Sequence, residues 1–211
     1  MISLTGILSL LSALAATSYA LSCTQCASQS KTCSDGIIVT CQSGYKCGSI
    51  YSETTAGLSG VNFAYLLRSC LPSSECNFKG SITNLQQKTR MVTSCCETDN
   101  CIPTIPALPT QSSDPNGVVC RSCFSGDSTW CYTSDTIKCT GDENMCLLQS
   151  TQTTGLTTAI RGCATKSYCE LGVQSRSSTG AKVTCTSGGI SVRTVVLTPA
   201  IACLLLLKSF F

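Results

Sequence analysis

Short runs of β-branched and aromatic residues alternate with glycine- and hydroxyl-rich stretches through the middle of the chain. Such runs occupy residues 37–40, 48–53 and 61–68. Runs of this composition, bounded by turn-forming residues, are typical of β-strands. Residues 47–70 are therefore expected to form a long hairpin with its tip near Gly57, and residues 146–163 a shorter hairpin with its tip near Gly155. The pattern predicts all-β, loop-rich structure.

The first twenty residues have the pattern of a secretory signal peptide. They carry no charge, their apolar run covers 7–16, and Ser18, Tyr19 and Ala20 supply a small-x-small cleavage pattern. An apolar run this short does not span a bilayer core of about 30 Å. Residues 1–20 are therefore predicted to be a signal peptide.

The last residues have the pattern of a GPI-attachment signal. Three small residues at 187–189 are followed by a short polar stretch and an apolar tail at 195–211. A small cleavage site, a spacer and an apolar tail form the layout of such a signal. Ser187 and Gly188 are therefore candidates for the attachment site, with residues 188–211 removed. The alternative is a transmembrane helix, for which a tail of 17 residues is at the lower limit of length.

The cysteines repeat one spacing along the chain. The first block consists of Cys23, Cys26, Cys33, Cys41, Cys47, Cys70, Cys76, Cys95, Cys96 and Cys101. The second block consists of Cys120, Cys123, Cys131, Cys139, Cys146, Cys163, Cys169 and Cys185. The first seven gaps hold 2, 6, 7, 5, 22, 5 and 18 residues in the first block and 2, 7, 7, 6, 16, 5 and 15 in the second. The chain is therefore predicted to contain two copies of one module, at residues 21–102 and 119–187.

Residues 103–118, between the two modules, contain four prolines. Proline fixes φ and has no backbone N–H, so this stretch is expected neither to form a helix nor to join the interior of a sheet. It is predicted to be an extended, semi-stiff linker.

Each module is too short to bury a large core. Residues 21–189 hold 18 cysteines, an even number, as full pairing in an oxidising compartment predicts. A disulfide contributes on the order of 2–4 kcal/mol, so several of them could replace what burial does not supply. The composition thus predicts a small disulfide scaffold.

The spacing of Cys23 and Cys26, together with the closing run of residues 95–101, resembles the three-finger domain of the lymphocyte-antigen-6/urokinase-receptor family. The resemblance covers nearly all of residues 21–187. Among two-module members, the cysteine layout is most similar to the gamma-type secretory phospholipase inhibitors and their cell-surface relatives. The resemblance implies an all-β, small disulfide-rich fold of two tandem three-finger (snake-toxin-like) domains.

Spacing alone leaves the bonding order open, since even six cysteines allow 15 connectivities. The resemblance implies five disulfides in the first module: Cys23–Cys47, Cys26–Cys33, Cys41–Cys70, Cys76–Cys95 and Cys96–Cys101. It implies four in the second: Cys120–Cys146, Cys123–Cys131, Cys139–Cys163 and Cys169–Cys185. The second module has no counterpart of the Cys96–Cys101 bond.

The composition excludes several classes of chemistry. The chain has no histidine, which excludes Ser-His and Cys-His catalysis and zinc sites with imidazole ligands. Residues 21–189 hold 12 Lys and Arg against 11 Asp and Glu, a net charge too weak for nucleic-acid binding. The Cys-x2-Cys pairs would need free thiolates to bind zinc or act in redox chemistry, and secreted chains rarely keep them.

Two pairs of acidic residues are the nearest approach to a catalytic constellation. Glu97 with Asp99, and Asp142 with Glu143, fall in polar turns, where solvated loop charge is expected. The sequence pairs no nucleophile with a base. We therefore predict that the protein is not an enzyme and uses no metal and no cofactor.

Binding to another protein is the function that remains. The candidate contact residues are Tyr51, Leu58, Phe63 and Tyr65 in the first module and Trp130 and Leu156 in the second. Alternation along the long hairpin places Phe63 and Tyr65 on one face and Leu66 on the other. The alternative is that these side chains pack against the neighbouring finger or module.

The sequence therefore predicts a GPI-anchored, extracellular protein-binding protein of receptor or adhesion type. The alternative is a soluble secreted inhibitor of secretory phospholipases. The predicted partner is an extracellular or cell-surface protein, a secreted phospholipase in the alternative, and the predicted location is the outer leaflet of the cell membrane or the extracellular medium. No nucleic-acid partner is expected.

Overall fold

The structure is a computed structural model that describes residues 20–33, 35–57, 60–174 and 181–187. The predicted contact residue Leu58, the candidate attachment site Gly188 and nearly all of the predicted signal peptide lie outside these residues. Within the described residues, no helix is long and apolar enough to cross a membrane.

The first module consists of six strands and one short 3-10 helix. They are β1 (Ser22–Ser28), β2 (Ile37–Thr40), β3 (Tyr45–Ala56), β4 (Asn62–Pro72), η1 (Ser73–Glu75), β5 (Lys79–Thr83) and β6 (Gln87–Cys96). The long hairpin of β3 and β4 spans residues 45–72, and its connection includes Gly57, as the sequence predicts. The three-finger arrangement follows from this central hairpin, with the β1–β2 and β5–β6 pairs on either side.

The second module repeats this plan with one added helix. Its elements are β7 (Pro115–Arg121), β8 (Cys123–Ser125), β9 (Thr136–Thr140), β10 (Met145–Thr153), β11 (Leu156–Ala164), α2 (Lys166–Gln174) and β12 (Ala181–Ser187). Thr153 pairs with Leu156, which leaves a two-residue turn at the tip of the β10–β11 hairpin. Gly155 has φ +88° in this turn, a conformation that glycine adopts without steric cost.

Helix α2 departs from the expectation of purely β modules. Thr165 precedes the helix, and its Oγ1 accepts a hydrogen bond from the backbone N–H of Tyr168, the arrangement of an N-cap. The helix then packs on β12, to which the disulfide Cys169–Cys185 ties it. Strand propensity had pointed away from a helix, and the cap and the disulfide outweigh it.

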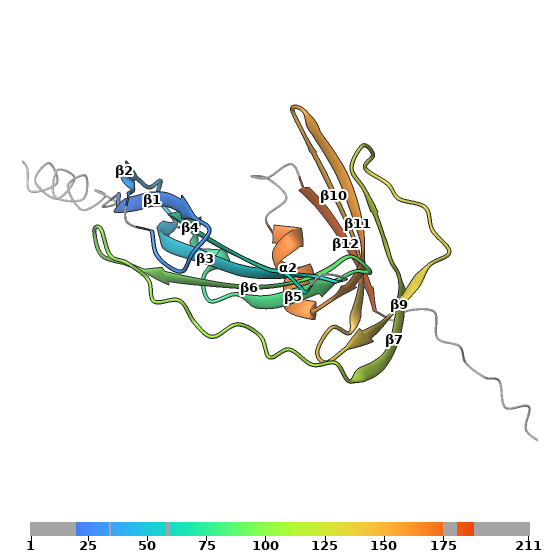
Figure 1. The fold of residues 1–211 in the computed structure, drawn as a ribbon. Helices are drawn as coiled ribbons and strands as arrows, with labels where there is room; N and C mark the ends of the chain where they lie inside the picture. Colours follow the sequence, from blue (N-terminus) through green and yellow to red (C-terminus); the bar gives the residue numbers. More distant parts are fainter. Residues whose placement is uncertain (1–19, 34, 58–59, 175–180, 188–211) are drawn as a thin grey trace, which may run out of the picture.

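The two modules share one sheet, which the sequence did not predict. Strand β5 of the first module pairs with β11 of the second through Thr83–Cys163 and Ile82–Ala164. The described residues thereby form a ten-stranded sheet with the order β12-β10-β11-β5-β6-β3-β4-β1-β2, and β8 adds to β11. Figure 1 shows α2 in the angle between the strands of the two modules.

An apolar cluster fixes this junction. It consists of Ile82 from the first module with Leu147, Ala164, Cys169 and Val183 from the second. Hydrogen bonds run alongside it: the backbone N–H of Thr165 donates to Ser81 O at 3.0 Å, and the N–H of Ser81 donates to Thr165 Oγ1 at 3.1 Å. Shared strand pairing and shared core make the two modules one body.

The connection between the modules is shorter than the expected linker 103–118. Strand β7 begins at Pro115, which takes the first position of an outer strand, where a missing N–H is tolerated. Residues before it form no helix or strand, as predicted, but they are packed. Ile105 and Leu108 lie against the buried side chains of β3, β4 and β6, and Arg90 donates a hydrogen bond to Pro109 O at 3.3 Å.

Among the described residues, nine disulfides staple the two modules. They join the same cysteines as the family pattern implies: Cys23–Cys47, Cys26–Cys33, Cys41–Cys70, Cys76–Cys95, Cys96–Cys101, Cys120–Cys146, Cys123–Cys131, Cys139–Cys163 and Cys169–Cys185. Several of these sulfurs form the core at the base of each module. The cross-links thus replace the large apolar core that each short module lacks.

Candidate functional site

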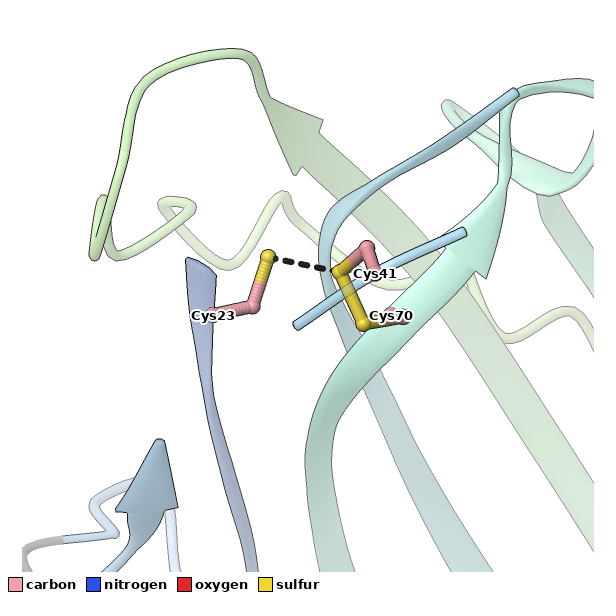
Figure 2. Close-up of side chains that lie close together, drawn as sticks. All are labelled: Cys23, Cys41 and Cys70. Carbon is pink, nitrogen blue, oxygen red and sulfur yellow. Dashed lines mark hydrogen bonds between the residues drawn. A yellow bond between two sulfur atoms is a disulfide. The ribbon is translucent and has the colours of Figure 1, made fainter. Parts of the chain in front are cut away.

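Three cysteine sulfurs gather at the base of each module, at a spacing that could suit a metal ion. In the first module they belong to Cys23, Cys41 and Cys70, which lie within 4.8 Å of one another. Figure 2 shows Cys41 bonded to Cys70 and its Sγ 3.0 Å from Sγ of Cys23, which is itself bonded to Cys47. Metal binding needs thiolates, so these packed disulfides are structural groups.

The exposed aromatic residues of the first module lie on β4. Phe63 and Tyr65 are 61% and 46% exposed, whereas Leu66 on the same strand is fully buried. The alternation that the sequence predicts for this hairpin is therefore confirmed. Two aromatic side chains project from a rigid strand into solvent, where a partner could reach them.

Tyr51, predicted as a contact residue, is buried instead. Its side chain is 2% exposed and packs with Leu66 and Val92 on the sheet face that the connecting segment covers. Its hydroxyl donates to Glu53 Oε1 at 2.6 Å. Burial, followed by this hydrogen bond and the nearby negative charge, raises the pKa of Tyr51 to about 12. The prediction that Tyr51 contacts a partner is wrong, because the segment after the first module lies over its face.

The candidates of the second module fall differently. Trp130 is half-exposed, and the guanidinium of Arg161 lies 4.2 Å from the centre of its ring. Its neighbour Tyr132 is 92% exposed. The side chain of Leu156, at the start of β11, lies outside the described residues. Ser187 is the exposed last residue of β12.

Phe63 and Tyr65 belong to a larger surface, which we call the outer face and define by Ile50, Ser52, Phe63, Tyr65 and Met91. Tyr65 pairs with Ser52 and Ser52 pairs with Met91, so these three side chains form one row across β4, β3 and β6. Ile50 lies two residues along β3 and shares their side of the sheet. The outer face thus carries apolar and aromatic groups on three adjacent strands.

The outer face continues into a cleft between the modules. This cleft has a volume of about 310 Å³. Ile50 and Met91 line it from the first module, and Leu171 of α2, Ala181 and Val183 line it from the second. Because the modules share a sheet, both walls of the cleft are held in fixed positions. The arrangement offers contact surface and places no nucleophile beside a base.

Glu143, expected as a solvated loop charge, is 1% exposed. Its Oε1 accepts hydrogen bonds from Ser81 Oγ at 2.6 Å and from Thr83 Oγ1 at 2.8 Å, and Lys88 Nζ lies 3.8 Å away. All three partners belong to the first module. The expectation is wrong for Glu143, because the turn that carries it faces the other module, and no feature of the sequence marks that turn.

The other three acidic residues are exposed as predicted. Asp99 accepts a hydrogen bond from the backbone N–H of Ser22 at 2.8 Å. Lys46 donates to Glu97, and this bond with the attraction of the charge lowers the pKa of Glu97. Asp142 is exposed beside buried Glu143.

Two disulfide-stapled modules of three fingers each define a class of extracellular binding proteins. The u-PAR/Ly-6 domain matches residues 19–103 and 116–191. The chain therefore belongs to the u-PAR/Ly-6 domain family, and the resemblance seen in its cysteines is confirmed.

Similar proteins include a receptor and an inhibitor, and neither is named as an enzyme. The chain is 38% identical over 81 residues to the urokinase plasminogen activator surface receptor of Bos taurus, which covers 36% of this chain and 24% of the receptor. It is 27% identical over 158 residues to a gamma-type phospholipase A2 inhibitor of Gloydius brevicaudus siniticus, which covers 72% of this chain and 77% of the inhibitor.

The match to the receptor spans about a quarter of the receptor's length. Among solved structures, mouse TEX101 is similar with a TM-score of 0.37 and 16% identity, over 79% of this chain and 99% of that one.

Proposed function

We propose that this protein is a GPI-anchored, extracellular receptor or adhesion protein without catalytic activity, which binds another extracellular protein through its outer face. The observation that carries this proposal is the exposed pair Phe63 and Tyr65 on a sheet that two modules and their disulfides make rigid. Aromatic side chains contribute strongly to protein interfaces. A surface that is ordered before binding loses little conformational entropy on association.

The proposed anchor is attached at Ser187 or Gly188 after removal of the C-terminal signal. Ser187 ends the edge strand β12, so a lipid attached there would leave the protein from the rim of the second module. The test treats expressing cells with phosphatidylinositol-specific phospholipase C and follows the surface protein. Release into the medium is expected. Retention on the cell, or full recovery in the medium without treatment, would contradict the anchor.

The binding proposal is tested with the outer face altered. The double variant Phe63→Ser with Tyr65→Ser removes both exposed rings and leaves the disulfides intact. Two aromatic contacts at an interface contribute about 2 kcal/mol or more, so binding to partner-bearing cells should weaken about thirtyfold. Tyr132→Ser, which alters an even more exposed tyrosine on the other module, is the matched control and should bind as the wild type does.

A second candidate function is a soluble secreted inhibitor of secretory phospholipases. It is favoured by the identity of 27% with the gamma-type phospholipase A2 inhibitor over 72% of this chain. The purified protein would then slow phospholipid hydrolysis by a secreted phospholipase A2 and would accumulate in the medium. Loss of this inhibition in the Phe63 and Tyr65 double variant would place both functions on the same surface.

A further inference from the structure

A second surface lies on the other side of the second module's sheet, away from α2. It is a groove of about 880 Å³, which we call the basic groove. Leu148 and Ser150 of β10 line it, and Thr184 and Lys182 of β12 stand opposite them in register. Trp130, from the segment after β8, lines it as well. Leu147 and Val183, which alternate with these residues, pack in the core beside α2.

Three cations line the basic groove: Arg121, Arg161 and Lys182. Within the described part of the chain, no Asp or Glu lines the groove, and none of the three cations forms an ion pair. Trp130 holds the guanidinium of Arg161 in place, and the buried Nε of Arg161 has no hydrogen-bond partner. These charges therefore lack acceptors that an anionic ligand would supply.

The register of the strands sets the spacing of the charges. Arg161 pairs with Leu148 across β11 and β10, and Lys182 pairs with Ser150 on the next row of β12. Strands lie about 4.8 Å apart and successive rows about 6.7 Å apart, so the two Cα atoms are about 12 Å apart. One small anion does not reach both cations. In an extended peptide, side chains four residues apart point the same way and are about 13 Å apart.

We propose that the basic groove binds an extended acidic segment of a protein, with two carboxylates four residues apart on Arg161 and Lys182 and an apolar side chain between them on Leu148. This proposal rests on the proposed function only in that the partner is a protein. A sulfated glycan carries the same charge but is polar along its whole length, so it would leave Leu148 without a contact. Arg161 also already covers one face of the Trp130 ring, on which a sugar could otherwise stack.

The test uses the full chain, as cells display or release it, and a fluorescent nine-residue peptide. The peptide carries glutamate at its third and seventh positions, leucine at its fifth and threonine elsewhere, and its control carries glutamines in place of the glutamates. Fluorescence anisotropy should show binding of the glutamate peptide at least tenfold tighter than of the control, weakening as salt is raised. Arg161→Gln and Lys182→Gln should each weaken binding about tenfold.

Lys166→Gln is the matched control, because Lys166 is an exposed cation of α2, outside the groove. Mass measurement without reductant checks that each variant keeps its disulfides, and Lys182→Gln on the edge strand decides the matter if Arg161→Gln does not fold. Equal binding of the two peptides, or no effect of either groove variant, would overturn the proposal. Binding of a sulfated hexasaccharide through the same residues, without binding of the glutamate peptide, would overturn it too.

The two proposals fail separately. The Phe63 and Tyr65 double variant should still bind the glutamate peptide, because both residues lie outside the groove. Loss of partner binding in that variant with peptide binding retained supports both proposals. Absence of peptide binding in the wild type refutes only the acidic ligand of the basic groove.

Discussion

Glu143 offers the sharpest test of the junction between the modules, because a single carboxylate of the second module holds three groups of the first. Glu143→Ala removes the acceptor of the Ser81 and Thr83 hydroxyls and the charge partner of Lys88, whose side chain is 16% exposed. Removing one partner of a buried ion pair destabilises a protein by about 3–5 kcal/mol, because the other charge is left without compensation. We expect Glu143→Ala to fall in this range.

Glu143→Gln separates the charge from the hydrogen bonds. Its amide oxygen still accepts from the two hydroxyls, and its NH₂ group replaces Oε2, which has no hydrogen-bond partner. The loss is then mainly that of the Lys88 attraction and of charge-assisted bonding, about 1–2 kcal/mol. Asp142→Ala, the exposed neighbour, is the matched control and should change stability by less than about 0.5 kcal/mol.

The assay is equilibrium unfolding in guanidinium chloride of the oxidised protein, followed by the fluorescence of its single tryptophan, Trp130. The predicted order of the free energy of unfolding is wild type and Asp142→Ala highest, Glu143→Gln lower and Glu143→Ala lowest. Equal stability of Glu143→Ala and Asp142→Ala would refute the reasoning, since it would mean that Glu143 is solvated.

Three further predictions follow from the same contacts. Gly162→Ala should destabilise the junction by about 1–3 kcal/mol and increase hydrogen exchange in β5, because the new Cβ would lie 2.1 Å from Thr83 O, whereas Gly126→Ala, whose Cβ meets only a ring at 3.6 Å, should not. The raised pKa of Tyr51 means that its folded form holds the proton more tightly than the unfolded form, so this contribution to stability is present below about pH 10 and lost as the pH rises towards 12. In an ultraviolet titration Tyr51→Phe should remove one late-ionising tyrosine, and loss of an ordinary one instead would contradict its burial. Full reduction and alkylation should abolish partner binding, and a reduced protein that still binds would argue against the disulfide scaffold.

The parts of the fold that depend on local pattern were predictable. Period-two alternation fixed which of Phe63 and Leu66 faces solvent, and the turn at Gly155 follows from a glycine between two strand-forming runs. The cysteine spacing predicted two modules because loop length varies more than the cross-linked base. These features need only near neighbours in the chain.

The features that depend on distant contacts were not predictable. Alternation assigns Tyr51 to a face but does not say what covers that face, and the covering residues Ile105 and Leu108 come from a segment expected to be a free linker. Glu143 lies in a polar turn like that of Asp142, and only the pairing of β5 with β11 brings the first module against it. Contacts between modules leave no periodic signal in the sequence.

The central claim is that the outer face of this rigid pair of modules binds an extracellular protein. A photoreactive benzoylphenylalanine in place of Tyr65 tests it directly, with the same group in place of Tyr132 as the comparison. On illumination of live cells, the protein labelled at position 65 should form a covalent adduct with a cell-surface or secreted protein, and the one labelled at 132 should not. Absence of any adduct from position 65, or equal adducts from both positions, would contradict the account.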